Sequence, residues 1–215
     1  MPARRRTAVL ISGRGSNLGA LIDAAADPAY PAEIALVLSN RAAATGLDRA
    51  RAAGIATAAV SYKAAGAAAA EAEMTAILAA NGIEIICLAG YMRLLSADFV
   101  ARWRDRMLNI HPSLLPLFPG LDTHERALAA GVKVHGCTVH FVRHEMDSGP
   151  IIGQAAVPVL DTDTPETLAA RVLGAEHVLY PGALALVASG GVRVEDERCV
   201  FDRPQPGAGA MLVSL

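Results

Sequence analysis

Aromatic residues and cysteines are scarce in this sequence of 215 residues. Aromatics make up 4% of the chain whereas 53% of the residues are hydrophobic, so any core must consist mainly of aliphatic side chains. The three cysteines are widely spaced and form neither a CxxC pair nor a Cys/His zinc pattern. The sequence therefore implies neither a disulfide framework nor a structural zinc, and it fits a reducing, cytoplasmic compartment.

An excess of charge of one sign is also missing, because the net charge is -2. General nucleic-acid binders usually carry a strong basic excess, so we expect no nucleic-acid partner. No apolar run approaches the ~20 residues of a membrane-spanning helix. The apolar run after the N-terminal arginines is also too short for a secretory signal. We therefore expect a cytoplasmic globular protein without a membrane partner.

Short apolar runs alternate with helical stretches in the first half of the chain. This alternation predicts βαβ units and a parallel sheet covered on both faces. Right-handed crossovers then give an α/β fold with a Rossmann-like, doubly wound sheet. The predicted strands are 7–12, 33–39, 57–60 and 83–89, and the predicted helices are 17–26, 43–53 and 64–80.

The second half of the chain changes character. Two runs that alternate apolar and polar residues predict antiparallel strands at the edge of the sheet. We expect a single domain over residues 1–203, followed by a loose Pro/Gly/Ala-rich tail over 204–215. The elements predicted here are a strand at 106–110, a helix at 123–130, the edge strands 136–142 and 151–159, a helix at 165–189, and a hairpin of 192–194 with 199–201.

The segment 12–17, with the sequence SGRGSN, joins the first predicted strand to the first predicted helix. Glycines let the backbone approach a ligand closely, and a helix start offers free N–H groups to an anion. A GxGxxG motif would need glycine at position 18, which is leucine, and the ending of a P-loop is absent. The pattern favours a monophosphate site. The alternative is a tight turn capped by Ser16 or Asn17.

Asn109 and His111 stand two residues apart at the end of a predicted strand, so both side chains point to one face. Asp147 precedes a Ser-Gly-Pro turn that would fix it in place. An amide can stabilise an oxyanion, an imidazole can move protons near neutral pH, and a carboxylate can orient the imidazole. These three residues predict an acyl-transfer site. The alternative is that His111 is a packing residue and Asp147 a turn residue.

Metal and covalent catalysis are not expected. His135 and His140 are five residues apart in a predicted strand and so face opposite sides, and no HExxH motif is present. A nucleophilic serine would need a GxSxG turn, which is absent. We expect Cys137, in the middle of a predicted strand, to belong to the core.

Five motifs in order make the chain similar to the phosphoribosylglycinamide formyltransferases, a family of folate-dependent formyltransferases. They are LISGRGSNL (10–18), LAGYMRLLS (88–96), NIHPSLLPLFPGLDTHERAL (109–128), HGCTVHFV (135–142) and MDSGPIIGQ (146–154). The resemblance implies a formyltransferase fold. It also implies transfer of the formyl group of 10-formyltetrahydrofolate to the amine of glycinamide ribonucleotide, with no metal.

The resemblance assigns roles to individual residues. The implied catalytic residues are Asn109, His111 and Asp147. The implied ribonucleotide site consists of Gly15, Ser16, Asn17 and Glu176. The implied folate site consists of Met92, Arg93, Leu94, Leu95, Asn109, Arg143, His144, Glu145, Met146 and Asp147.

Two features of the family remain open in this chain. An arginine frequent in segment 63–70 of similar proteins is missing, and Lys63 is a possible substitute. A polar residue frequent three positions before the residue that matches Glu176 is here Leu173, which weakens one expected phosphate contact. The alternative functions are a formyltetrahydrofolate deformylase, in which water replaces the amine, and a non-catalytic folate- or nucleotide-binding module. A deformylase usually carries an additional N-terminal domain, which a first strand at residue 7 does not favour. A binding module would not need the Asn/His/Asp set. We expect a monomer or a homodimer.

Overall fold

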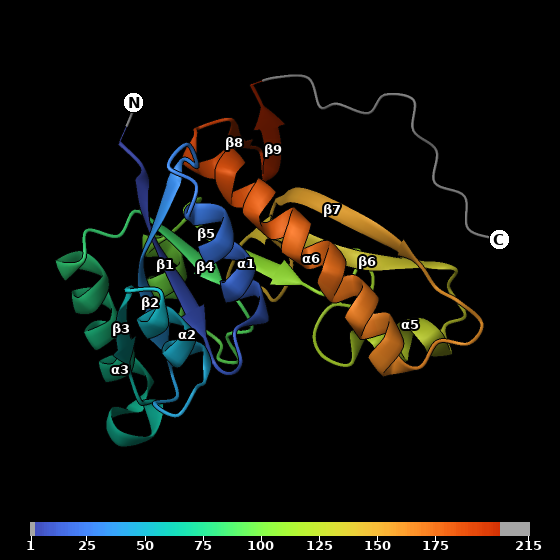
Figure 1. Ribbon diagram of the computed structural model, residues 1–215, viewed down its shortest axis with the longest axis horizontal. Coiled ribbons are helices and arrows are strands. Elements are labelled where there is room, and N and C mark those ends of the chain that lie inside the picture. The colour runs from blue at the N-terminus through green and yellow to red at the C-terminus, as the bar shows by residue number, and fades with distance from the viewer. Residues whose placement is uncertain (1–2, 203–215) are drawn as a thin grey trace.

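A seven-stranded sheet forms the centre of the computed structural model, which describes residues 3–202 (Figure 1). Its strands lie in the order β3-β2-β1-β4-β5-β6-β7. A short hairpin of two further strands, β8 and β9, forms a separate sheet beyond the last helix. The strands are β1 (Arg5–Ile11), β2 (Ala32–Ser39), β3 (Ala56–Ala59), β4 (Ile85–Leu88), β5 (Met107–His111), β6 (Val134–Phe141), β7 (Ile151–Pro158), β8 (Val192–Glu195) and β9 (Arg198–Phe201).

Strands β1 to β5 pair in parallel, whereas β6 and β7 pair antiparallel at one edge. This arrangement confirms the predicted doubly wound sheet with antiparallel edge strands. The chain leaves β1 toward β2 and β3, and leaves β4 toward β5, so the strand order reverses between β1 and β4. Such a switch point opens a crevice at the carboxyl ends of the strands, where α/β proteins bind ligands.

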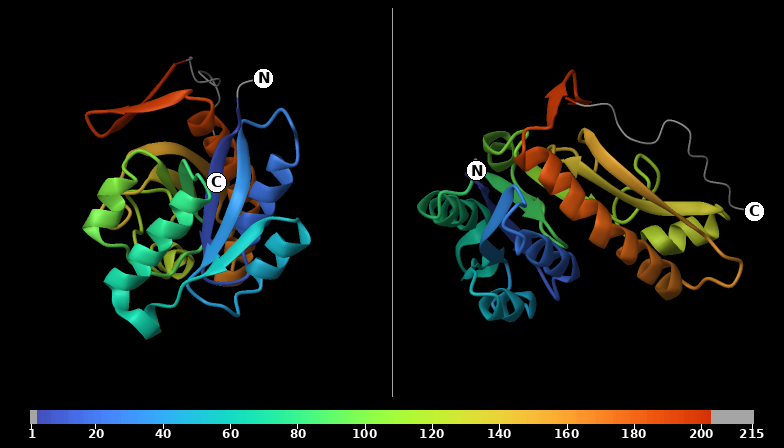
Figure 2. Two further views of the ribbon diagram at one scale, coloured as in Figure 1. Left: turned by 90° about the vertical axis from the view of Figure 1, so that its left-hand side faces the viewer. Right: turned by 45° about the horizontal axis from the view of Figure 1, so that its top comes forward.

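Helices cover both faces of the sheet (Figure 2). Side chains alternate along the central strands, so Val9 and Ile11 pack on one face and Ala8 and Leu10 on the other. Helices α1, α2, α5 and α6 contribute to the first core, and α3 and α4 to the second. Cys137 is fully buried in the first core, as predicted. The helices are α1 (Ser16–Ala25), α2 (Gly46–Ala52), α3 (Tyr62–Ala80), α4 (Ala97–Arg102), α5 (Thr123–Ala129) and α6 (Pro165–Ala188).

Helix α4 was absent from the sequence prediction. It is six residues long, and the hydroxyl oxygen of Ser96 accepts a hydrogen bond from the Phe99 N–H at its start. A helix this short shows too few turns for a periodic apolar pattern. Its Phe99 and Val100 are nevertheless buried, so it closes the second core.

Two helices begin more than one residue away from their predicted starts. Helix α2 begins three residues later than predicted, because the Gly46 N–H is bonded to the Gly13 carbonyl at 3.1 Å. Helix α3 begins at Tyr62 and is interrupted at Gly66, whose φ of 78° is not helical. The predicted tail 204–215 lies outside the described residues. Within residues 3–202, no helix is both long and apolar enough to cross a membrane.

Candidate active site

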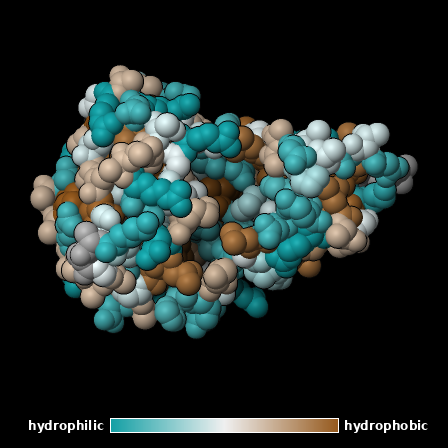
Figure 3. Space-filling view, turned by 90° about the horizontal axis from the view of Figure 1, so that it is seen from below, coloured by the Kyte–Doolittle hydropathy of each residue, from teal (hydrophilic) through white to brown (hydrophobic). Residues whose placement is uncertain are grey.

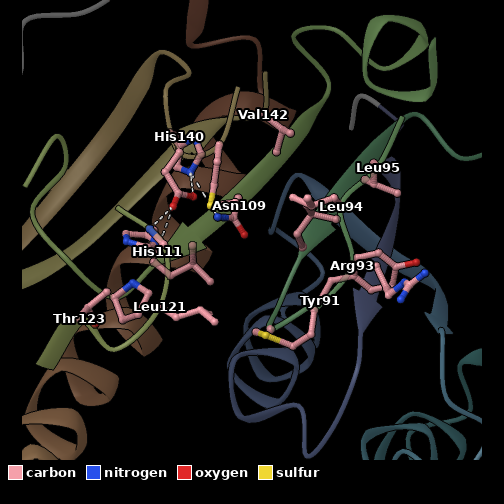
Figure 4. Close-up of a pocket in the computed structure, with 18 of the residues that line it drawn as sticks. Tyr91, Arg93, Leu94, Leu95, Asn109, His111, Leu121, Thr123, His140 and Val142 are labelled. Carbon is pink, nitrogen blue, oxygen red and sulfur yellow. Dashed lines mark hydrogen bonds and ion pairs between the residues drawn. The ribbon is translucent and has the colours of Figure 1, made fainter. Parts of the chain in front are cut away.

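A cavity of about 650 Å³ opens on the sheet face beside the switch point. Figure 3 shows the molecule hollowed between its broad and narrow parts, with apolar side chains gathered around the hollow. Figure 4 shows two walls: Tyr91, Leu94 and Leu95 lie on one side, and Asn109, His111 and His140 on the other. The apolar side chains at its mouth are more than half exposed, namely Met92, Leu94, Leu121 and Met146.

The glycine loop lies where β1 ends. Gly15 has a φ of 67° and stands at the N-cap position of α1, and within residues 3–202 no side chain caps this helix. The capping by Ser16 or Asn17 that the alternative interpretation predicted is therefore not seen. The first N–H groups of α1 are left without a side-chain acceptor, an arrangement suited to an anion.

Asn17 instead points toward α6. Its Nδ2 donates to Glu176 Oε2 at 2.6 Å, and both side chains are buried. Burial raises the pKa of Glu176, and the hydrogen bond from Asn17 offsets part of this effect. Asn17 Oδ1 is buried without a hydrogen-bond partner among the described residues. The predicted ribonucleotide residues are thus brought together, although Glu176 lies 159 positions from Asn17.

Asn109 is held by a histidine on the neighbouring strand. In the β5–β6 ladder it pairs directly with His140, and its Nδ2 lies 3.2 Å from His140 Nε2. His140 Nδ1 lies 3.0 Å from the Phe141 carbonyl, which can only accept. Nδ1 therefore carries the proton, and Nε2 accepts from the Asn109 amide. Burial lowers the pKa of His140, which keeps this neutral form in place.

His111 lies between two acceptors. Its Nε2 is 3.0 Å from the Phe118 carbonyl, and its Nδ1 is 3.4 Å from Asp147 Oδ2. Both ring nitrogens can therefore donate when the ring carries two protons. Asp147 Oδ2 also accepts from the Gly120 N–H at 2.8 Å, so the carboxylate is fixed on two sides. The structure thus brings Asn109, His111 and Asp147 into one cavity.

The predicted folate residues divide into two groups. Met92, Arg93, Leu94 and Leu95 line the cavity, as do His144 and Met146, whereas Glu145 does not. Arg143 contributes to the lining, but its guanidinium is bonded to Asp105 and Glu197, outside the cavity. The outward direction of the Arg143 guanidinium could not be predicted, because Asp105 and Glu197 lie in turns that are distant in the sequence.

A second cavity of about 530 Å³ adjoins the first, and Met92 and Arg93 line both. Three cationic side chains surround it: Arg41, Lys63 and Arg93. The Arg93 guanidinium stacks on the Tyr62 ring, 4.6 Å from its centroid. This cavity therefore suits an anionic part of a ligand. Lys63, the possible substitute for the missing arginine, lies in its wall.

Two further residues at this site have no role that the sequence predicts. His140 is raised there only as a metal ligand, whereas the antiparallel register sets it opposite Asn109. Ser12 belongs to the glycine loop, and its hydroxyl donates to Asn40 Oδ1 at 2.6 Å and accepts from the Met92 N–H at 2.8 Å. Ser12 thus joins the glycine loop to the cavity wall that contains Met92. Within residues 3–202, no three His, Cys, Asp or Glu side chains cluster as a metal site would need.

Known proteins are similar to this chain in sequence and in structure. The formyl transferase family model matches residues 5–184. The chain is 53% identical over 194 residues to the trifunctional purine biosynthetic protein adenosine-3 of Bos taurus. The matched region covers 90% of this chain but only 19% of that relative, so this chain spans about a fifth of the length of the trifunctional protein.

Bacterial relatives match along nearly their whole length. Phosphoribosylglycinamide formyltransferase of Escherichia coli is 44% identical over 90% of this chain and 92% of its own. The crystal structure of glycinamide ribonucleotide transformylase 1 from Symbiobacterium toebii superposes with a TM-score of 0.90 at 46% identity, covering 94% of this chain and 95% of that one. The chain belongs to the formyl transferase family.

Proposed function

We propose that this protein transfers the formyl group of 10-formyltetrahydrofolate to the amine of glycinamide ribonucleotide, a step of purine biosynthesis. The observation that carries the proposal is the convergence of Asn109, His111 and Asp147 in one cavity, whose wall residue Met92 is hydrogen-bonded to Ser12 of the glycine loop. Relatives that match this chain along most of their own length bear the transferase name, which favours a transferase over a deformylase.

The subsites fit the two substrates. The uncapped N-terminus of α1 suits the single phosphate of the ribonucleotide, and buried Glu176 and Asn17 face the same region. The apolar wall of Met92, Leu94 and Leu95 suits a flat pterin. The cationic second cavity suits the carboxylates that folates carry.

The chemistry follows from charge development at the formyl group. The neutral amine attacks the formyl carbon, a C–N bond forms, and the carbonyl oxygen becomes an oxyanion. The Asn109 amide, oriented by His140, donates one N–H to this oxygen, since Nδ2 keeps a second hydrogen free. The His111 imidazole, in the same cavity, can move protons during the reaction. Removing one such donor typically lowers kcat by ~10²–10³.

Collapse of the intermediate breaks the bond between the formyl carbon and the folate nitrogen. The attacking amine loses a proton and the folate nitrogen gains one, so no net proton is consumed. Asp147 is held by the Gly120 N–H and lies 3.4 Å from His111 Nδ1, so it can orient the His111 ring and pass this proton directly or through water.

A spectroscopic assay of folate product, with and without glycinamide ribonucleotide, tests the proposal. Product is expected only when the ribonucleotide is present. Turnover without it, with release of formate, would instead establish a deformylase and leave the glycine loop a structural turn.

A His111→Ala variant tests the division of roles at the site. It should abolish transfer while calorimetric binding of the ribonucleotide persists, because His111 lies on the folate-side cavity and not at the glycine loop. Loss of ribonucleotide binding in this variant would contradict that division.

A further inference from the structure

The loop between β6 and β7, residues 142–150, carries Asp147 into the cavity. The loop leaves β6 beside Leu108, at the opposite end of β5 from His111. It then folds back over the sheet face until Asp147 reaches His111. Its base is narrow, because a Cβ on Gly149 would lie 1.7 Å from the Phe141 carbonyl oxygen. The tip, residues 144–146, is exposed.

Few side chains fasten this loop to the rest of the protein. Among the described residues, Asp147 bonds to Gly120 near the end of the loop, whereas Ser148 bonds only within it, to the Glu145 carbonyl. At the start of the loop, Arg143 Nε donates to Glu197 Oε2 and its NH2 group to Asp105 Oδ1, both at 2.7 Å. The Arg143 side chain is only 8% exposed.

The two acidic partners come from distant parts of the chain. Asp105 lies in the turn before β5, and Glu197 lies in the turn of the β8–β9 hairpin. Both have a φ of 57°, a left-handed conformation that is costly without glycine, and Asp196 beside Glu197 has a φ of 47°. Such conformations persist where the surrounding structure fixes them. The hydrogen bond from Arg143 lowers the pKa of Glu197, so its carboxylate remains charged.

We propose that Arg143 is a positioning residue: clamped from outside the cavity by Asp105 and the hairpin residue Glu197, it orders loop 142–150 for binding of the formyl donor. The C-terminal hairpin thereby sets the affinity for the folate substrate without touching it. The part of this inference that concerns the folate rests on the proposed function. Its physical basis is that a loop already ordered before binding loses less conformational entropy on binding.

The test compares variants that remove one charge and keep the shape. Glu197→Gln and Asp105→Asn should each raise the KM for 10-formyltetrahydrofolate by about 5-fold, with a smaller effect on kcat and no change in the KM for glycinamide ribonucleotide. Arg143→Lys should resemble them, because an ammonium cannot span two carboxylates as a guanidinium does. The double variant with Arg143→Gln and Glu197→Gln should have the same folate KM as Arg143→Gln alone.

Matched controls come from the same hairpin and its neighbour. Among the residues that the structure describes, Glu195 pairs only with Arg193 on its own strand, so Glu195→Gln should leave both KM values unchanged. Arg104 also pairs with Glu197 but is exposed, so Arg104→Gln should have little effect. An equal rise of the folate KM in the Glu195→Gln control would show a general loosening of the hairpin and overturn the proposal.

Amide hydrogen exchange supplies a readout that needs no substrate. Residues 143–148 should exchange faster in Glu197→Gln than in the wild type, while β5 and β6 exchange equally in both. Unchanged exchange in this loop would refute the proposal. A rise of the folate KM in Arg143→Gln that is absent from Glu197→Gln and Asp105→Asn would also refute the proposal, since Arg143 would then contact the folate directly. An inactive wild-type protein would refute the proposed function instead, and the exchange measurement would still decide whether the clamp orders the loop.

Discussion

Replacement of His140 by leucine should lower kcat through its effect on Asn109. His140 is 2% exposed, and its Nε2 accepts the hydrogen bond that fixes the Asn109 amide. Leucine fills a similar volume and offers no acceptor, so the amide would be free to rotate. A His140→Gln variant keeps a side-chain oxygen and should recover part of the lost activity.

The size of the effect follows from the bond itself. The contact joins two neutral groups at 3.2 Å, and such a hydrogen bond contributes ~0.5–1.5 kcal/mol net. If this energy acts entirely in the transition state, kcat falls by about 2- to 12-fold at ~1.4 kcal/mol per factor of ten. Complete loss of an oxyanion donor sets the upper limit at ~10²–10³. We therefore expect a fall of about 10-fold for His140→Leu.

Steady-state kinetics of formyl transfer at neutral pH measure this effect, with circular dichroism to confirm that the variant is folded. The decisive comparison is a double-mutant cycle with Asn109→Ala. Since His140 acts through Asn109, the double variant should be no slower than Asn109→Ala alone. Additive losses in the double variant, or an unchanged kcat in His140→Leu, would refute the reasoning.

Three further predictions concern the loop, the core and the pH dependence of stability. Gly15→Ala forces alanine into a φ of 67° with its Cβ 3.2 Å from Leu18 Cβ, so it should raise the KM for glycinamide ribonucleotide while leaving the folate KM unchanged in the same assay. Leu10→Ala removes a fully buried side chain and should lower the free energy of unfolding by ~2–5 kcal/mol in urea titrations. Burial lowers the pKa of His135 to about 4. Between about pH 6.5 and 4 the unfolded chain therefore binds a proton at this residue that the folded chain does not. The free energy of unfolding should fall by ~2–3 kcal/mol as the pH drops through this window. A His135→Gln variant should flatten that slope, and an equal slope in both proteins would contradict the assignment.

The parallel sheet could be predicted because its determinants are local. Runs such as those of β1 and β2 are apolar on both faces, and only strands buried between two layers of helices need that pattern. Helix α4 could not be predicted, since six residues hold less than two turns. The late start of α2 depends on the Gly13 carbonyl, more than 30 positions away.

In the candidate site too, the features that depend on local sequence could be predicted, and those that depend on distant residues could not. Asn109 and His111 could be assigned to one face because strand alternation is a local property. The partner of Asn109 could not be assigned, since the register between β5 and β6 depends on the whole sheet. The direction of the Arg143 side chain was also beyond prediction, because its partners lie 38 and 54 positions away.

The β5–β6 ladder has a consequence for how the protein loses activity under stress. Asn109 and His111 stand on β5, whereas His140 and Asp147 arrive with the antiparallel hairpin that closes the edge of the sheet. Local opening of an edge requires less free energy than global unfolding. In a denaturant series, catalysis should therefore disappear at lower concentrations than the far-ultraviolet circular dichroism of the parallel strands and their helices. Enzyme activity would then report the integrity of this one ladder, and not that of the fold as a whole.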